Sequence, residues 1–313
     1  YITSSKYAMV SQYLSVVYCI MEMDTRELPE GGSFCVGKSI TCGQGAGCRD
    51  DWSDLVRTFK ITLPEELQCI ELHTFADEHI GDAHCDVKRL QERIQYVADT
   101  PNAYCILNGD ILDNATKTSI GDIYMQEFNP MEQLKCAVEL FAPIKDKILA
   151  VTHGNHEART YRKEGIDMSY LIAQQLGVAE RYTQTSAVIF LRFGRTSGHT
   201  HNRAQRYTIY CLHGSGGGRK EGAKAIRLAD MASIVDADIY IHSHTHLPMV
   251  MKQGYFRTDP CNSACRHVTK LFINTAANLD YGGYGAAQEY KPGSKDTPII
   301  YLDGTRHGMT AQL

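Results

Sequence analysis

CIELHTFADEHIG, residues 69–81, is an apolar run of strand length that ends in side chains able to bind a metal ion or move a proton. The run over 69–76 predicts a β-strand, because short apolar segments bounded by polar residues are typical of strands. Asp77, Glu78 and His79 follow it directly. In α/β sheets such strand ends carry the functional side chains, so this stretch predicts a site as well as a strand.

Apolar runs of similar length continue to the end of the chain, with helical stretches between the early ones. We expect strands at 69–76, 103–109, 148–154, 187–194, 207–214, 238–243, 271–276 and 298–303. We expect helices at 86–98 and 131–141. Strands that alternate with helices predict an α/β fold, whose site lies past the C-terminal ends of the strands.

The composition is that of a globular protein, and bulk charge gives no sign of nucleic-acid binding. The chain has 313 residues, of which 43% are hydrophobic and 22% charged, and its net charge is -4. This balance argues against an extended basic face, although a short basic loop could still hold one phosphate. The longest apolar run near the N-terminus, LSVVYCIM, is too short to span a bilayer, so we expect no membrane partner.

Eleven cysteines are scattered along the chain without a CxxC pair. Cys42 with Cys48, or Cys261 with Cys265, could bind a metal ion. Reduced and mostly buried thiols explain the odd number better, because disulfides are rare in cytosolic proteins. We therefore expect a cytoplasmic protein.

The first part of the chain has a different pattern from the rest. Apolar residues at helical spacing predict a helix within about the first thirty residues, and a stretch containing Gly and Cys follows. We expect residues 1–66 to be an N-terminal appendage of unknown role and residues 67–313 to form the main domain. The chain begins with Tyr1 rather than Met, so we expect it to be trimmed or a fragment.

Five of the expected strand ends carry carboxylate, imidazole or amide side chains. In chain order they are Asp77 and His79; Asp110 and Asp113; Asn155 and His156; His213; and His244 and His246. This mixture of nitrogen and oxygen ligands suits first-row ions such as Mn, Fe or Zn. Two such ions, about 3.5–4 Å apart, can clamp both oxygens of an in-line displacement at phosphorus.

The order of these motifs resembles that of the calcineurin-like metallophosphoesterase superfamily, whose pattern is DxH, GDxx(D/N), GNH(D/E), a single His and GHxH. The resemblance extends from about Gln68 to the C-terminus. Each motif is weak alone, but five in the same order, each at an expected strand end, form a specific signal. The resemblance implies a four-layer α/β/β/α sandwich of two mixed sheets, with residues 67–313 as the catalytic domain.

The resemblance also implies a role for each side chain. Two ions would share the Asp110 carboxylate and be held by seven residues: Asp77, His79, Asp110 and His246 for one ion, and Asp110, Asn155, His213 and His244 for the other. A hydroxide that bridges the metals would attack phosphorus, and His156, oriented by Asp113, would protonate the leaving oxygen. Taken singly, Asp113 could instead cap a helix and Asn155 could serve a turn.

Two motifs occur twice, so a choice is needed. SGHTHN at 197–202 matches the GHxH spelling better than HSHTHL at 242–247, where Ser243 replaces the usual Gly and tolerates positive φ less well. The family pattern requires a lone His before GHxH, and only the second run has one, His213. We therefore expect the first run to be a hairpin loop. The motif Asp82-Ala83-His84 also spells DxH, but it lies five residues beyond the strand end, so we favour Asp77 and His79.

The substrate is less well determined than the metal ligands. GNHE with Asp113 resembles the protein phosphatases, but Asn114 replaces the Arg of those enzymes. The stretch GSGGGRKEGAKAIR after His213 could be a flexible connection, or its Arg219, Lys220 and Lys224 could bind phosphate. Arg159 is a further candidate phosphate contact.

The run from HGSGGGRKEG to HSHTH resembles phosphoesterases of bacteriophages and prophages, which implies a nucleotide or nucleic-acid substrate. A protein or small-molecule phosphomonoesterase is the alternative. A non-catalytic, metal-stabilised binding scaffold is the alternative of another class.

Overall fold

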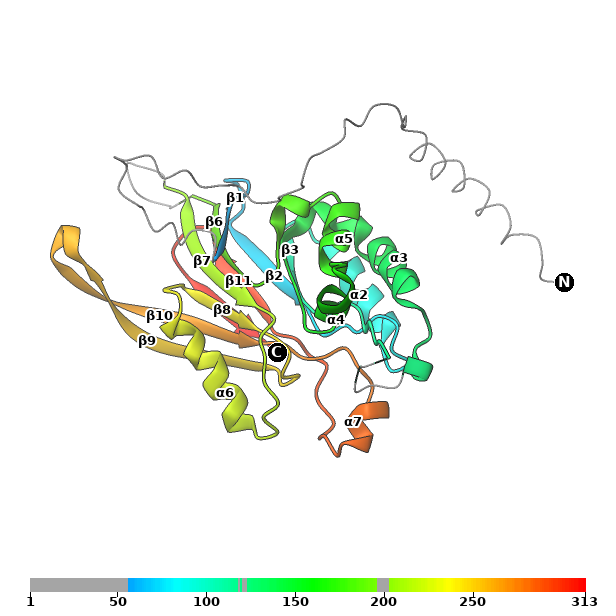
Figure 1. The fold of residues 1–313 in the computed structure, drawn as a ribbon. Helices are drawn as coiled ribbons and strands as arrows, with labels where there is room; N and C mark the ends of the chain where they lie inside the picture. Colours follow the sequence, from blue (N-terminus) through cyan, green and yellow to red (C-terminus); the bar gives the residue numbers. More distant parts are fainter. Residues whose placement is uncertain (1–55, 118, 120–122, 196–202) are drawn as a thin grey trace, which may run out of the picture. The chain divides into compact units, whose positions relative to one another are not determined.

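The computed structural model describes residues 56–117, 119, 123–195 and 203–313. Two six-stranded sheets pack face to face, with helices on the outer faces of both (Figure 1). This arrangement confirms the predicted four-layer α/β/β/α sandwich. No helix in the described part of the chain has the length and apolar composition needed to cross a bilayer.

One sheet, called sheet B, contains the strand that ends at Asp77. Its order is β12(Met309–Gln312), β11(Ile299–Asp303), β2(Cys69–Phe75), β3(Ala103–Asn108), β4(Ile148–Thr152) and β5(Tyr182–Thr183). The strands β2, β3, β4 and β5 run parallel to one another, whereas β11 pairs antiparallel with β2 and with β12. Parallel neighbours need crossover connections, and the helices between them supply these.

The other sheet, called sheet A, is also mixed. Its order is β1(Arg57–Thr62), β6(Ser186–Phe193), β7(Gln205–Leu212), β8(Ile239–His242), β10(Ala264–Asn274) and β9(Met249–Asp259). The strands β7, β8 and β10 run parallel, and β6–β7 and β9–β10 are antiparallel hairpins. The expected hairpin on either side of residues 197–202 is therefore confirmed, while residues 196–202 themselves lie outside the described part.

Helices form the outer layers. They are α2(Val87–Asp99), α3(Pro130–Phe141), α4(Glu157–Glu164), α5(Met168–Gln175), α6(Glu221–Asp230) and α7(Gly283–Ala287). Asp86 caps α2 by accepting a bond from a backbone N–H, and Asn129 with Glu132 forms a capping box at α3. The first two helices match the expected ranges 86–98 and 131–141 to within one residue.

Apolar side chains pack in three clusters that separate the four layers. One cluster lies between the sheets and includes Leu72 and Ile106 of sheet B with Ile209 and Ile241 of sheet A. A second packs sheet B against α2, α3 and α5, and a third packs sheet A against α6. The central strands β3, β4 and β8 are largely apolar on both faces because both faces are buried.

All eight expected strands are present, but the expected domain boundary needs a correction. The strand β1 lies within residues 1–66, yet it is the edge strand of sheet A, paired in parallel with β6, and its Phe59 is buried between the sheets. The sequence missed it because RTFKIT has only two apolar residues, Phe59 and Ile61, among charged and polar ones. The sandwich therefore begins at about Arg57 rather than at residue 67, and residues 1–55 lie outside the described part. The strands β5, β9 and β12 were also missed.

Candidate metal centre

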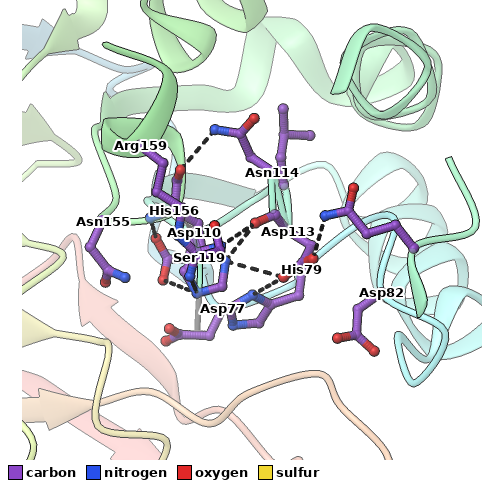
Figure 2. A network of polar contacts seen from close by, with 12 residues as sticks. Asp77, His79, Asp82, Asp110, Asp113, Asn114, Ser119, Asn155, His156 and Arg159 are labelled. Carbon is purple, nitrogen blue, oxygen red and sulfur yellow. Dashed lines mark hydrogen bonds and ion pairs between the residues drawn. The ribbon is translucent and has the colours of Figure 1, made fainter. Parts of the chain in front are cut away.

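The side chains selected from the sequence gather at one edge of the sandwich. Figure 2 shows those of sheet B: Asp77, His79, Asp110, Asp113, Asn155 and His156. They follow the C-terminal ends of β2, β3 and β4 in sheet B and of β7 and β8 in sheet A. Within each sheet these strands are parallel, so their C-terminal ends meet at one edge. Asn108 joins the two sheets there, since its Nδ2 donates to Leu212 O at 2.9 Å and to Ser243 Oγ at 2.7 Å.

Three groups of side chains have ligand atoms within 4.8 Å of one another. They are Asp77 with His79 and His246; Asp110 with His213 and His244; and His79 with Asp113 and His156. The groups adjoin, because His213 Nε2 lies 3.1 Å from Asp110 Oδ2, 3.0 Å from Asn155 Oδ1 and 3.9 Å from Asp77 Oδ1. The structure therefore brings together all seven predicted ligands and both predicted catalytic residues.

The backbone at this edge is held in an uncommon conformation. Five of the predicted ligands have left-handed φ values: Asp77 (53°), His79 (50°), Asp110 (51°), His244 (66°) and His246 (53°). Such residues cost about 1–3 kcal/mol each and persist only where the surroundings hold them. Here backbone hydrogen bonds do so, from Asp77 N to Gly109 O at 3.2 Å and from His79 N to Asp110 O at 3.1 Å. Strain concentrated on side chains with ligand atoms favours a functional explanation over a structural one.

One buried polar atom makes this edge fit a metal ion. The His79 side chain is 4% exposed, and its Nε2 has no hydrogen-bond partner among the described residues. Leaving a buried polar atom unpaired costs about 1–3 kcal/mol. A cation bound next to Asp77 and His246 would give this nitrogen a partner and would compensate the buried carboxylate, so the donor set fits the expected ion.

The pKa shifts follow from burial and from the neighbouring charges. Burial alone would lower the pKa of His213, but the Asp110 and Asp77 carboxylates outweigh it and raise that pKa to about 10. Burial and His213 lower the pKa of His244 to about 4. Although burial opposes it, the neighbouring imidazoles lower the pKa of Asp110 well below its usual value. Ionised Asp110 and neutral His244 are the forms that bind metals, whereas His213 must first lose a proton.

His156 lies beside Asp113 and Arg159 at the N-terminal end of α4. Its Nδ1 is 2.7 Å from the Asp113 carbonyl oxygen and 3.2 Å from Asp113 Oδ1. Its Nε2 faces the metal ligands, 3.8 Å from Asp110 Oδ2, and accepts from Arg159 Nη2 at 2.9 Å. Asp113 also accepts from Gln126 Nε2 at 2.7 Å, and no helix in the described part of the chain begins directly after it.

Glu157 supports the centre and was not singled out in the sequence. Its side chain is fully buried, and its two carboxylate oxygens accept from Asp110 N at 3.0 Å and Leu112 N at 2.9 Å. Gly154 packs closely above Asp110, where an added Cβ would lie 2.2 Å from Asp110 Oδ1. The available signal was the motif GNHE itself, because its first and last residues frame the turn that carries Asn155 and His156.

The duplicated motifs differ in the structure as far as they are described. Asp82 and His84 bind each other, with Oδ1 to Nδ1 at 3.0 Å, and Figure 2 shows Asp82 apart from the labelled ligands. Neither belongs to a group of ligand atoms among the described residues. Ser243 does not have a positive φ, so serine in place of glycine causes no strain there. His199 and His201 lie outside the described residues.

Of the candidate phosphate contacts, Arg159 contacts residues of the metal centre, whereas Arg219 and Lys220 have no described contact with it. Arg159 touches the centre, as its Nη1 also donates to the Asp113 carbonyl oxygen at 3.0 Å. The Arg219 guanidinium lies over the Tyr290 ring at 5.1 Å, and Lys220 is exposed at the N-terminal end of α6. Lys224 Nζ donates to Thr245 O at 2.7 Å, which supports the loop between His244 and His246.

A search of solved structures found matches at low sequence identity. A conserved uncharacterized protein from Streptococcus pneumoniae TIGR4, a predicted phosphoesterase, is 13% identical over 79% of this chain and 99% of its own, with a TM-score of 0.31. Vacuolar Protein Sorting 29 from Cryptosporidium parvum is 12% identical over 79% of this chain and 98% of its own, with a TM-score of 0.38. Wild-type Vps29 from Entamoeba histolytica, complexed with zinc, is 11% identical over 78% and 97%, with a TM-score of 0.32.

No curated protein matches the chain. A family model does match, that of the calcineurin-like phosphoesterases, over residues 79–248, which is more than half of the 313 residues. The match contains the strand ends from His79 to His246 in their family order and begins two residues after Asp77. The chain therefore belongs to the calcineurin-like phosphoesterase family.

Proposed function

We propose that the chain is a phosphoester hydrolase that depends on two divalent transition ions, drawn from Mn, Fe and Zn. The observation that carries the proposal is the unpaired, buried His79 Nε2 within a convergent set of carboxylates and imidazoles. One ion would be held by Asp77, His79, Asp110 and His246, and the other by Asp110, Asn155, His213 and His244. A set this polar, buried at a strained edge, serves no packing purpose.

Asp110 is the proposed shared ligand. Its carboxylate lies next to His213 of one proposed ion, and the nearby His79 of the other contributes to its lowered pKa. Its Oδ1 also accepts from His156 N at 2.9 Å, so the carboxylate is fixed in orientation. A shared carboxylate reduces the repulsion between two cations that are held a few ångströms apart.

When bound, such ions supply Lewis acidity that polarises a phosphoryl oxygen and lowers the pKa of water. The chain itself supplies the proton for the leaving oxygen from His156 Nε2, with Asp113 holding the opposite nitrogen. In the free protein Nε2 accepts a bond from Arg159, so protonation of Nε2 requires the guanidinium to turn away. A substrate phosphate gives Arg159 another acceptor, and we therefore assign Arg159 to phosphate binding.

The substrate class that we favour is a nucleotide or nucleic acid, in a cytoplasmic enzyme of phage or prophage type. It rests on the sequence between His213 and His246, where Arg219 and Lys220 are further candidate contacts. A protein or small-molecule phosphomonoesterase is the alternative. A non-catalytic scaffold would need the ligands but has no use for His156 between Asp113 and Arg159, so this arrangement favours an enzyme.

A metal-dependence screen tests the proposal. The protein is treated with a chelator, reloaded with Mn, Fe or Zn, and assayed on p-nitrophenyl phosphate and bis-p-nitrophenyl phosphate. We expect activity only after reloading, and the preferred substrate separates a monoesterase from a diesterase. Metal binding without hydrolysis of either substrate, or of a nucleotide or DNA, would support the scaffold instead.

A further inference from the structure

A notch opens in sheet A at the end opposite the metal centre, because β8 is only four residues long. It pairs with β7 from Ile209 onward and with β10 from Leu271 onward. The first residues of β7 and of β10 therefore have no strand between them. Asp238 closes the bottom of the gap, since its backbone N–H donates to Thr208 O at 2.9 Å.

The notch is a hollow of about 780 Å³ with a strongly cationic lining. Its lining residues come from β6, β7, β10 and the turns beside them: Arg192, Arg203, Ala204, Arg206, Arg266 and His307. All four arginines are exposed. We call this feature the arginine notch. Ligand sites in proteins typically measure about 300–1,000 Å³, so it is large enough for a small molecule.

Two of the lining arginines face each other without compensation. Arg192 and Arg206 are direct cross-strand partners in the β6–β7 hairpin, so their side chains leave the same face of the sheet. Within the described residues neither guanidinium forms an ion pair or a side-chain hydrogen bond. Like charges placed directly opposite each other destabilise a sheet. The pair therefore lowers stability unless an anion lies between the two groups.

A second cross-strand arginine pair in the same sheet has acidic partners. Arg257 and Arg266 are cross-strand partners in the β9–β10 hairpin. Arg257 binds Asp236 at 2.9 Å and Asp238 at 3.4 Å. Acidic side chains thus neutralise Arg257, whereas the described part of the chain offers Arg192 and Arg206 no such partner.

The aspartates Asp236, Asp238 and Asp259 near the notch already pair with other basic side chains. Asp236 also binds Lys270 at 2.7 Å, and Asp259 lies 3.9 Å from Arg266. Asp238 accepts from Thr208 N and lies 3.7 Å from His307 Nε2, and this contact outweighs burial and raises the pKa of His307. These contacts leave no acidic partner for Arg192 and Arg206 among the described residues.

We propose that the arginine notch binds a small molecule that carries two or more phosphate groups. Guanidinium groups match phosphate oxygens through paired N–H donors, and several of them around one hollow suit a compact polyanion. An elongated nucleic acid would instead need a basic track, which the net charge of -4 does not suggest.

The site is separate from the metal centre. Arg206 and His213 are seven positions apart along extended chain, a distance of about 23 Å. A small ligand in the notch cannot touch the metal ligands, so the site would control or anchor rather than react.

The test measures binding of inorganic tripolyphosphate to the full chain by calorimetry at low salt. We expect the double variant Arg192→Gln/Arg206→Gln to bind about tenfold more weakly, through loss of charged hydrogen bonds. The single variant Arg266→Gln, which leaves the β6–β7 hairpin intact, should also weaken binding. The control Lys88→Gln/Lys135→Gln removes two exposed charges from α2 and α3 and should change affinity by less than about twofold, because distant surface charges are screened.

Further arms identify where the ligand binds and what it is. Binding should persist within about twofold in Asp110→Asn, since that change lies a full strand length away. Loss of binding in Asp110→Asn would place the ligand at the metal centre and overturn the proposal. Equal losses of tripolyphosphate affinity in the arginine and lysine double variants would also overturn the proposal. So would a short single-stranded DNA that binds more tightly than tripolyphosphate and depends on Arg192 and Arg206. The melting temperature of the arginine variant should equal or exceed that of the parent.

Discussion

The strand β7 has opposite charge environments at its two ends. At the C-terminal end His213 lies between two buried carboxylates, 3.1 Å from Asp110 and 3.9 Å from Asp77. At the N-terminal end Arg206 faces Arg192 across the hairpin, exposed to solvent. In the first region opposite charges are close, desolvated and fixed by strained backbone, so each change should have a large effect. In the second region like charges are hydrated, so each change should have a small one.

Asp110→Asn should produce the largest effect. The amide cannot supply the charge that two cations share, so we expect loss of both ions and a fall in activity by several orders of magnitude. Metal content measured by mass spectrometry after purification without chelators checks the first part. Asp82→Asn is the matched control, because Asp82 pairs with His84 outside the ligand groups, and should keep both ions. Full metal content in Asp110→Asn would show that the bridging role is wrong.

Alanine substitutions in the two His-Thr-His runs should have very different effects on activity and metal content. His244→Ala or His246→Ala removes a proposed ligand and should reduce activity by orders of magnitude. The double variant His199→Ala/His201→Ala should keep metal content and turnover within a few-fold of the parent. A collapse of metal binding in the double variant would overturn the assignment of His213 as well, because His213 was chosen by its order before the second run.

His156→Ala should retain both ions and slow the chemical step by about 10²–10⁴-fold. The loss should be greatest for substrates with basic leaving groups, since these depend most on a general acid. Comparing kcat for a series of substituted phenyl phosphates measures this dependence. Loss of metal in this variant would mean that His156 is a ligand, which its place beside His79 and Asp113 also permits.

Metal affinity should increase with pH. The pKa of His213 in the absence of metal is raised to about 10, so the imidazole is protonated at neutral pH and must release about one proton to become a ligand. Affinity should therefore rise about tenfold per pH unit between pH 6 and 8, all else being equal. Calorimetry in buffers of different ionisation enthalpy detects the released proton. An affinity that does not change over this range would contradict the protonated state.

Arg192→Gln should have the smallest effect of these changes. It should increase the free energy of unfolding, whereas the loss of a contact usually decreases it. Removing one member of an opposed like-charge pair should stabilise the ligand-free protein by about 0.2–1 kcal/mol. Urea unfolding at low salt measures the change, and added salt should reduce it through screening. A clear loss of stability would show that Arg192 has a structural contact that outweighs the repulsion.

The sequence by itself determined the α/β class, the eight strands that carry the motifs and the identity of the side chains at their ends. These features are local, because a ligand lies within a few residues of the strand that positions it. The distance from the strand end then sufficed to choose Asp77 over Asp82, and the pairing of Asp82 with His84 outside the ligand groups supports that choice.

The tertiary structure alone decided features that depend on residues far apart in the chain. It placed β1 at the edge of sheet A against β6, although more than a hundred residues separate them. It left His79 Nε2 without a partner among the described residues, and it brought Arg206 of β7 and Arg266 of β10 to one hollow beside the short β8. Strand pairing, burial and electrostatic compensation depend on which distant segments become neighbours, and no local pattern encodes that.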